Sequence, residues 1–205
     1  HGSLMGARGN SGVILSQILR GLSSTFSAHD SIDGALFTTA VESAASSAYG
    51  AVMKPVEGTI LTVVREASEA ARVSIDNGSA DLVEVLEAAL AQGRDALSRT
   101  PEMLPVLAEA GVVDAGGAGL LLLFEAALHV LDGRDLPEPP EGETAAVITA
   151  GFERPDEHSG DVSDMRYEVM FFLVADDERV PRFKDAWAEI GDSIVVVGGD
   201  GIWNC

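Results

Sequence analysis

Between residues 12 and 131, apolar side chains recur every three to four positions with almost no interruption, and this periodicity restricts the chain to a mainly helical fold. The pattern predicts long helices over 13–22, 34–53, 59–76, 82–97 and 120–131. Ser79 is expected to cap the fourth of these, and Thr100-Pro101 to open a short helix that Gly111 ends. Since residues 120–131 are apolar nearly all round, that helix is expected to be central.

The pattern changes after a proline-rich stretch at 137–143, which is typical of a stiff, extended linker. Beyond it, strands are predicted over 145–150, 167–174, 194–197 and from 202 onward, with a helix over 181–190 and a polar loop over 156–164. The predicted organisation is a helical domain over 1–136, the linker, and a truncated α/β domain over 144–205. The fold class is therefore mainly α, an antiparallel helical bundle followed by a small partial α/β domain.

Composition excludes several classes of partner. The 205 residues carry a formal net charge of −20, which argues against direct binding of nucleic acid or anionic membranes. No apolar run reaches membrane-spanning length, so no integral membrane segment is expected. The one cysteine, Cys205, fits a reducing compartment, and a cytoplasmic location is predicted.

A glycine-dense stretch, Met5 to Gly12, runs directly into the first apolar helix. The first turn of a helix has unpaired backbone N–H groups and partial positive charge, and glycines let that backbone approach an anion closely. The candidate phosphate-binding residues here are Gly9, Asn10, Ser11 and Gly12. The alternative is purely structural, an N-cap with glycines that admit a packed neighbour. The stretch is not a Walker A loop, because no Gly-Lys-Ser/Thr follows.

Two later helix starts have the same character. Thr59 follows Val56-Glu57-Gly58 near Lys54, and Asp114 precedes Ala115-Gly116-Gly117 at the most apolar helix. Each alone is explained by a cap or a tight turn. An anion pocket would form if these two helix starts converged with the stretch from Met5 to Gly12 at one end of a bundle. The candidate residues at the two later starts are Thr59, Asp114, Gly116 and Gly117.

Taken together, three motifs resemble the nucleotide-binding domain of bacterial fatty acid kinases, in the dihydroxyacetone kinase L-type family. They are MGARGNSGVILSQ at 5–17, KPVEGTIL at 54–61 and GVVDAGG at 111–117, and the resemblance covers about residues 4–136. It implies an antiparallel helical barrel that holds ATP at one end. By analogy, residues 9–12 would hold the β- and γ-phosphates, Thr59 would lie near them, and residues 114–117 would lie along the nucleotide. Residues from 145 onward resemble the start of the same proteins' middle domain.

The resemblance also implies magnesium, held in the family by clustered aspartates ahead of the glycine stretch. Nothing in residues 1–205 matches that cluster, so its aspartates are expected upstream of His1 and no catalytic residue is assigned. Many relatives place a metal-binding cysteine and a His-x-His motif in the middle domain, and neither is present here. Cys205 is interpreted as an ordinary strand residue.

Three functions are compatible with these residues. The first is a kinase component that phosphorylates the carboxylate of a fatty acid held by a separate DegV-like carrier protein. The second transfers phosphate to dihydroxyacetone or another small hydroxylated acceptor. The third is a non-catalytic nucleotide-binding or scaffold module. The fused middle domain favours the first function for the intact protein, and the absent aspartates favour the third function for this chain alone. A homodimer is one assembly that is compatible with the sequence.

Overall fold

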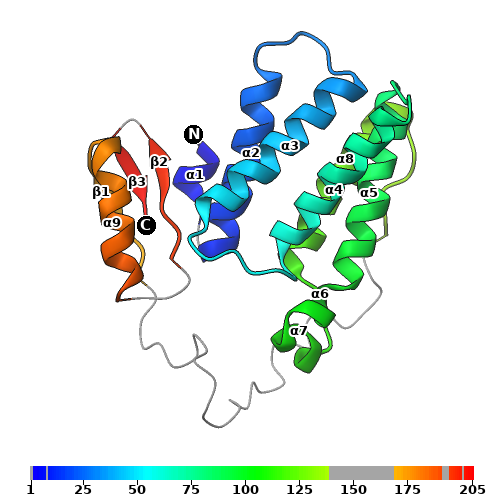
Figure 1. Ribbon diagram of the computed structural model, residues 1–205. Coiled ribbons are helices and arrows are strands. Elements are labelled where there is room, and N and C mark those ends of the chain that lie inside the picture. Colours follow the sequence, from blue (N-terminus) through cyan, green and yellow to red (C-terminus); the bar gives the residue numbers. More distant parts are fainter. Residues whose placement is uncertain (1, 8, 139–168, 191–193, 200) are drawn as a thin grey trace.

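A computed structural model describes residues 2–7, 9–138, 169–190, 194–199 and 201–205, and shows a helical body beside a small three-stranded sheet (Figure 1). The predicted class, mainly α with a small α/β part, is confirmed. The predicted strand at 145–150 and the polar loop at 156–164 lie outside the described residues.

The helical body consists of long helices joined by short connections. Its elements are α1 (Gly2–Gly6), α2 (Gly9–Phe26), α3 (Gly34–Ala51), α4 (Ile60–Asp76), α5 (Leu82–Ser98), the short α6 (Thr100–Met103) and α7 (Pro105–Ala110), and α8 (Ala115–Asp132). Successive long helices run in opposite directions, so α2, α4 and α8 all begin at the end that Figure 1 shows lowermost, where α6 and α7 also lie. We call this the lower end.

Several helix boundaries differ from the predicted ones. Residues 9–12 form the first turn of α2 instead of a loop, and α1 precedes them. Asp81, not Ser79, caps α5, because its carboxylate accepts from the Val83 and Glu84 amides at 2.8 and 3.1 Å. Local hydrogen bonds, which periodicity does not reveal, set these boundaries.

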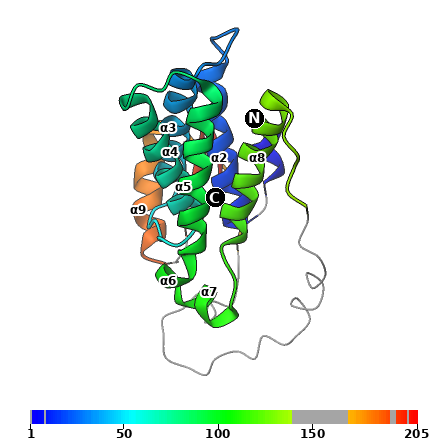
Figure 2. The ribbon, with the colours of Figure 1, turned by 90° about the vertical axis from the view of Figure 1, so that its right-hand side faces the viewer.

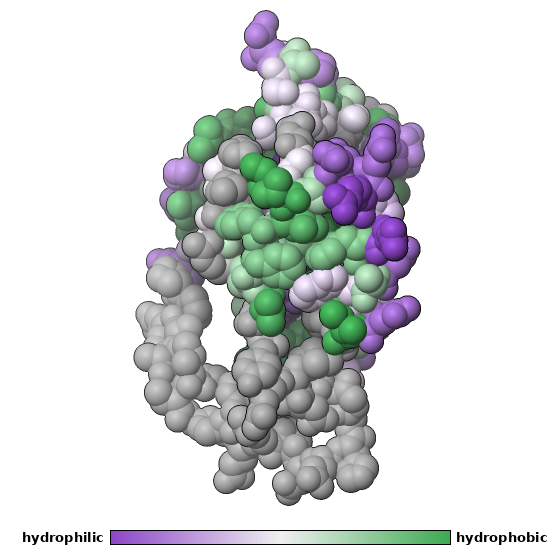
Figure 3. Space-filling model, turned by 90° about the vertical axis from the view of Figure 1, so that its left-hand side faces the viewer, coloured by the Kyte–Doolittle hydropathy of each residue, from purple (hydrophilic) through white to green (hydrophobic). Residues whose placement is uncertain are grey.

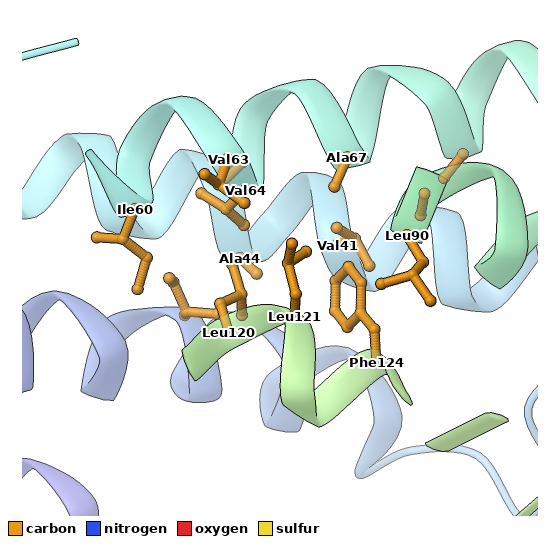
Figure 4. Close-up of a cluster of buried hydrophobic side chains, with 14 of the residues drawn as sticks. Val41, Ala44, Ile60, Val63, Val64, Ala67, Leu90, Leu120, Leu121 and Phe124 are labelled. Carbon is orange, nitrogen blue, oxygen red and sulfur yellow. The ribbon is translucent and has the colours of Figure 1, made fainter. Parts of the chain in front are cut away.

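One apolar core joins α2, α3, α4, α5 and α8 (Figure 4). Its buried side chains include Val41 and Ala44 of α3, Val63, Val64 and Ala67 of α4, Leu90 of α5, and Leu120, Leu121 and Phe124 of α8. The small residues of α3 allow close approach: a Cβ placed on Gly21 of α2 would lie 2.5 Å from the Ala44 Cα. Sequence-adjacent helices therefore pack backbone to backbone at this point.

Helix α8 lies at one side of the bundle rather than at its centre (Figure 2). Leu120, Leu121, Phe124 and Leu128 are buried, but Leu122, Leu123 and Val130 are exposed, the last by 82%. The expectation of a central helix is therefore wrong, because only one face of α8 is covered by the described residues. By length and composition alone α8 could cross a membrane, a test that core helices of soluble proteins also pass.

In its described residues, the C-terminal part contains an antiparallel sheet, in the order β1-β3-β2, a short 3-10 helix at Asp177–Arg179 and the helix α9. Its elements are β1 (Phe172–Val174), α9 (Val180–Ala188), β2 (Val197–Gly199) and β3 (Ile202–Asn204). Phe171, Phe183 and Trp187 form an aromatic cluster between the sheet and α9. Figure 3 shows apolar surface on the side of the molecule that carries this sheet. Among the residues of the sheet, Phe172, Val174 and Ile202 are exposed.

Candidate functional site

The starts of α4 and α8 lie against each other at the lower end. Asp114 is the N-cap of α8: its Oδ2 accepts from the Gly117 amide at 2.6 Å, and the Ile60 amide of α4 is close enough to act on the pKa of this carboxylate. The Asp114 amide donates to Thr100 Oγ1 at 3.1 Å, which ties the same residue to the start of α6. One aspartate thus connects three helices.

Gly116 and Gly117 make this approach possible. A Cβ on Gly117 would lie 2.7 Å from Val63 Cγ2, and one on Gly116 would lie 3.4 Å from the Ile60 Cβ. Any side chain at 117 would push α8 away from α4. These glycines lie inside α8 and serve close helix packing, instead of the tight turn that was the structural alternative, and they also bring Asp114 to the start of α4.

Thr59 is the N-cap of α4, and the loop before it is held from several sides. Its Oγ1 donates to the Val56 carbonyl at 2.8 Å and accepts from the Leu61 amide at 3.3 Å. Gly58 has φ +82°, a left-handed conformation, and a Cβ there would lie 2.9 Å from the Thr100 carbonyl oxygen. Only glycine fits both requirements.

Glu57 is the centre of a hydrogen-bond network that the sequence did not reveal. Its carboxylate accepts from Tyr49 Oη at 2.9 Å, Thr62 Oγ1 at 2.6 Å and Arg65 Nη2 at 3.2 Å. Thr62 Oγ1 accepts in turn from the Gly58 amide at 2.8 Å, and Arg65 Nε donates to Tyr49 Oη at 3.2 Å. Since Tyr49 is on α3 and Arg65 is on α4, only the packing of these helices brings them to one carboxylate.

Two acids at this end have pKa values shifted in opposite directions. Burial raises the pKa of Asp114, and the amides of Gly117 and Ile60 offset only part of that effect. Burial also acts to raise the pKa of Glu57, but the hydrogen bonds from Thr62, Tyr49 and Arg65 outweigh it, so its pKa is lowered. Glu57 is therefore held ionised by its donors, whereas ionisation of Asp114 is opposed by its surroundings.

The start of α2 lies at the same lower end, in a different environment (Figure 1). Gly9 has φ +64°, and Asn10 and Ser11 are exposed in the first turn. Gly12 lies against Ala7, since a Cβ on Gly12 would be 3.6 Å from the Ala7 Cβ, and the next residue, Val13, is buried against Val195 and Val197. The structure thus brings Thr59, Asp114, Gly116 and Gly117 together, and places Gly9, Asn10, Ser11 and Gly12 at the same end but beside the small sheet.

The structure also describes a pocket that lies away from this region. An open pocket between α4 and α5 is lined by Glu66, Glu69 and Glu84 and extends to Asn77 and Ser79, away from Thr59. Among the described residues, no three His, Cys, Asp or Glu side chains are grouped to hold a metal ion. The residues described here therefore do not fit a bound magnesium ion on their own.

Comparison with protein families matches residues 1–129 to the DAK2 domain and residues 164–205 to the FakA-like middle domain of fatty acid kinases. Similar proteins include Protein YloV of Bacillus subtilis, 36% identical over 208 residues, and an uncharacterised protein of Staphylococcus haemolyticus, 38% identical over 208 residues. An uncharacterised Staphylococcus aureus protein is 37% identical over 213 residues. Each alignment covers 98% of this chain but 37% of the relative. The match to the DAK2 domain covers more than half of the 205 residues, and a segment similar to the fatty acid kinase middle domain follows the matched part. This chain therefore belongs to the DAK2 domain family.

Proposed function

We propose that the helical domain binds ATP at its lower end. Gly9, Asn10, Ser11, Gly12 and Thr59 would contact the phosphates, while Asp114, Gly116 and Gly117 would lie along the nucleoside. The observation that carries this proposal is the position of three glycine-flanked helix starts at one end of one bundle. Each contributes backbone N–H groups and the positive end of a helix dipole, which suit an anion.

The charges favour this orientation of the nucleotide. The Asp114 carboxylate repels phosphate, but it can accept hydrogen bonds from the hydroxyl and amino groups of a nucleoside. The first turn of α2 contains no acidic residue, and its exposed Asn10 and Ser11 side chains can donate. The phosphates are therefore assigned to α2 and Thr59, and the nucleoside to the start of α8.

The wider proposal is an ATP-dependent kinase component that works in the cytoplasm on a fatty acid presented by a separate DegV-like carrier protein. The match of residues 164–205 to the FakA-like middle domain supports this acceptor over dihydroxyacetone. We also propose the division into residues 1–136, 137–143 and 144–205. Since the sequence of residues 1–205 has no aspartate cluster of the family kind, this chain is expected to bind ATP that arrives with magnesium, without transferring its phosphate.

Calorimetric titration of the 205-residue chain with MgATP tests the site. Ser11→Ala and Thr59→Ala should each weaken binding severalfold, while Thr39→Ala should not. Thr39 is a matched control, because its hydroxyl donates within α3 to the Ala35 carbonyl near the opposite end of the bundle. Affinity that is unchanged in Ser11→Ala and Thr59→Ala, or absent in the parent chain, contradicts the proposal.

The acceptor requires a separate measurement. Phosphate transfer from radiolabelled ATP is followed with a fatty acid and its carrier, and in parallel with dihydroxyacetone. A chain extended to the length of the relatives should label only the fatty acid, and the 205-residue chain should label neither. Labelling of dihydroxyacetone would contradict the fatty acid as the acceptor and would support the alternative function.

A further inference from the structure

Residues 194–198, which lead into β2 and include its first two residues, contact the helical body. The contacts lie next to both of the proposed phosphate-binding segments, residues 9–12 and the loop that ends at Thr59. Val195 forms an antiparallel bridge with Val52, and the Met53 amide donates to the Ile194 carbonyl at 3.3 Å. Val52 and Met53 end α3 and begin the connection that contains Lys54 and Thr59. The C-terminal part thus adds a short strand pairing to the loop before α4.

The same segment also covers the start of α2. Val195 and Val197 form a buried cluster with Ala7, Val13 and Ala51. Ala7 and Val13 lie on either side of the glycine-containing first turn of α2. A little further along α2, Arg20 Nη1 donates to the Gly198 carbonyl at 3.2 Å.

We propose that residues 194–198 are a brace that fixes both segments in the conformation needed for nucleotide binding. The first turn of a helix has N–H groups without helical partners and frays readily, and Gly9 and Gly12 add conformational freedom. Burial of Val13 under Val195 and Val197 opposes fraying at α2, and the bridge to Val52 restricts the loop that ends at Thr59. Val195 and Val197 are positioning residues, since neither is among the residues proposed to contact the nucleotide.

The effect on affinity rests on the proposed ATP site, and coupling of this kind works in both directions. If the brace favours the binding conformation, nucleotide must in turn favour the docked brace by the same factor. MgATP should therefore protect the amides of residues 194–198, although they lie outside the proposed site.

The test compares a Val195→Ala, Val197→Ala double variant with Val174→Ala in the 205-residue chain. Val174 is a matched control, because it belongs to the same sheet but is 81% exposed on β1. Hydrogen exchange without nucleotide should become at least about fivefold faster at residues 9–13 and 52–59 in the double variant, with α4, α5 and α8 unchanged. MgATP affinity should fall by a similar factor, and Val174→Ala should match the parent in both measurements.

The outcomes separate this proposal from the proposed function. Unchanged exchange at 9–13 and 52–59 in the double variant overturns the brace, even if the parent chain binds MgATP. A parent chain that does not bind MgATP overturns the ATP site, while the exchange data still decide whether the brace exists. Faster exchange throughout α4, α5 and α8 would show a general loss of the fold and would also overturn it.

Discussion

The first turns of α4 and α8 are held from within the helical body, and the loop that precedes α4 pairs in addition with the C-terminal part, whereas the start of α2 is held by the small sheet. At α4 and α8, Asp114 caps α8 beside the Ile60 amide of α4, and Gly117 packs directly on Val63. At α2, the neighbouring Val13 depends on Val195 and Val197 for its burial. Similar glycine-containing helix starts can thus be fixed by the core in one place and by a separate structural unit in another.

The largest expected effect is at Gly117. Gly117→Ala places a methyl group 2.7 Å from Val63 Cγ2, which is inside the core, and should lower the free energy of unfolding by roughly 1–3 kcal/mol. Gly119→Ala is the control, because nothing lies within 4 Å of its Cβ position, and it should stabilise α8 by up to about 1 kcal/mol. Urea unfolding measures both. Equal effects of the two variants would mean that α8 does not depend on close contact with α4.

The next effect concerns the cap that joins the two helices. Asp114→Ala removes the acceptor for the Gly117 amide and should cost about 1 kcal/mol of stability. Asp114→Asn keeps a capping oxygen and should cost only a small part of that. Thermal unfolding distinguishes them, and a loss as large for asparagine as for alanine would assign the effect to charge instead of capping.

A smaller effect is the dependence on pH, with opposite signs for two neighbouring acids. The folded-state pKa of Asp114 is raised, so its contribution to stability is largest below its unfolded pKa and declines as pH rises through the folded pKa. The folded-state pKa of Glu57 is lowered, so its contribution is present above its unfolded pKa and is lost as pH falls through the folded pKa.

Unfolding of the parent, Asp114→Asn and Glu57→Gln chains from about pH 3 to about pH 7 checks these signs. The advantage of the parent over Glu57→Gln should grow with rising pH, and its advantage over Asp114→Asn should shrink. If the advantage over Glu57→Gln shrinks with rising pH, the Glu57 network does not hold its carboxylate ionised, and if the advantage over Asp114→Asn grows, burial does not raise the pKa of Asp114.

The smallest expected effect on stability is at the start of α2. Ser11 is exposed, so Ser11→Ala should change the free energy of unfolding by less than about 0.5 kcal/mol. Its effect should appear in MgATP affinity alone, whereas Thr59→Ala should also lose a helix cap. Comparable losses of stability for both variants would remove the distinction between the two helix starts.

The long helices, the change to strands in the C-terminal part and the glycine-flanked helix starts could all be predicted from the amino-acid sequence, because periodicity and turn residues are local properties. Thr59 and Asp114 were also singled out in this way, and the structure shows both to be N-caps. The family followed from three short motifs, since they combine an unusual order of glycines and polar residues. The assignment of residues 9–12, Thr59 and 114–117 to a nucleotide stays a prediction.

Only the packing of the folded chain shows which of these elements contact one another. The Tyr49–Glu57–Arg65 network joins residues eight positions apart on different elements, and Val195 reaches Val52 across most of the chain. No periodic pattern encodes such partners, because they depend on how whole helices pack. The exposed face of α8 was missed for the same reason: an apolar helix has the same sequence pattern whether one face or all of it is covered.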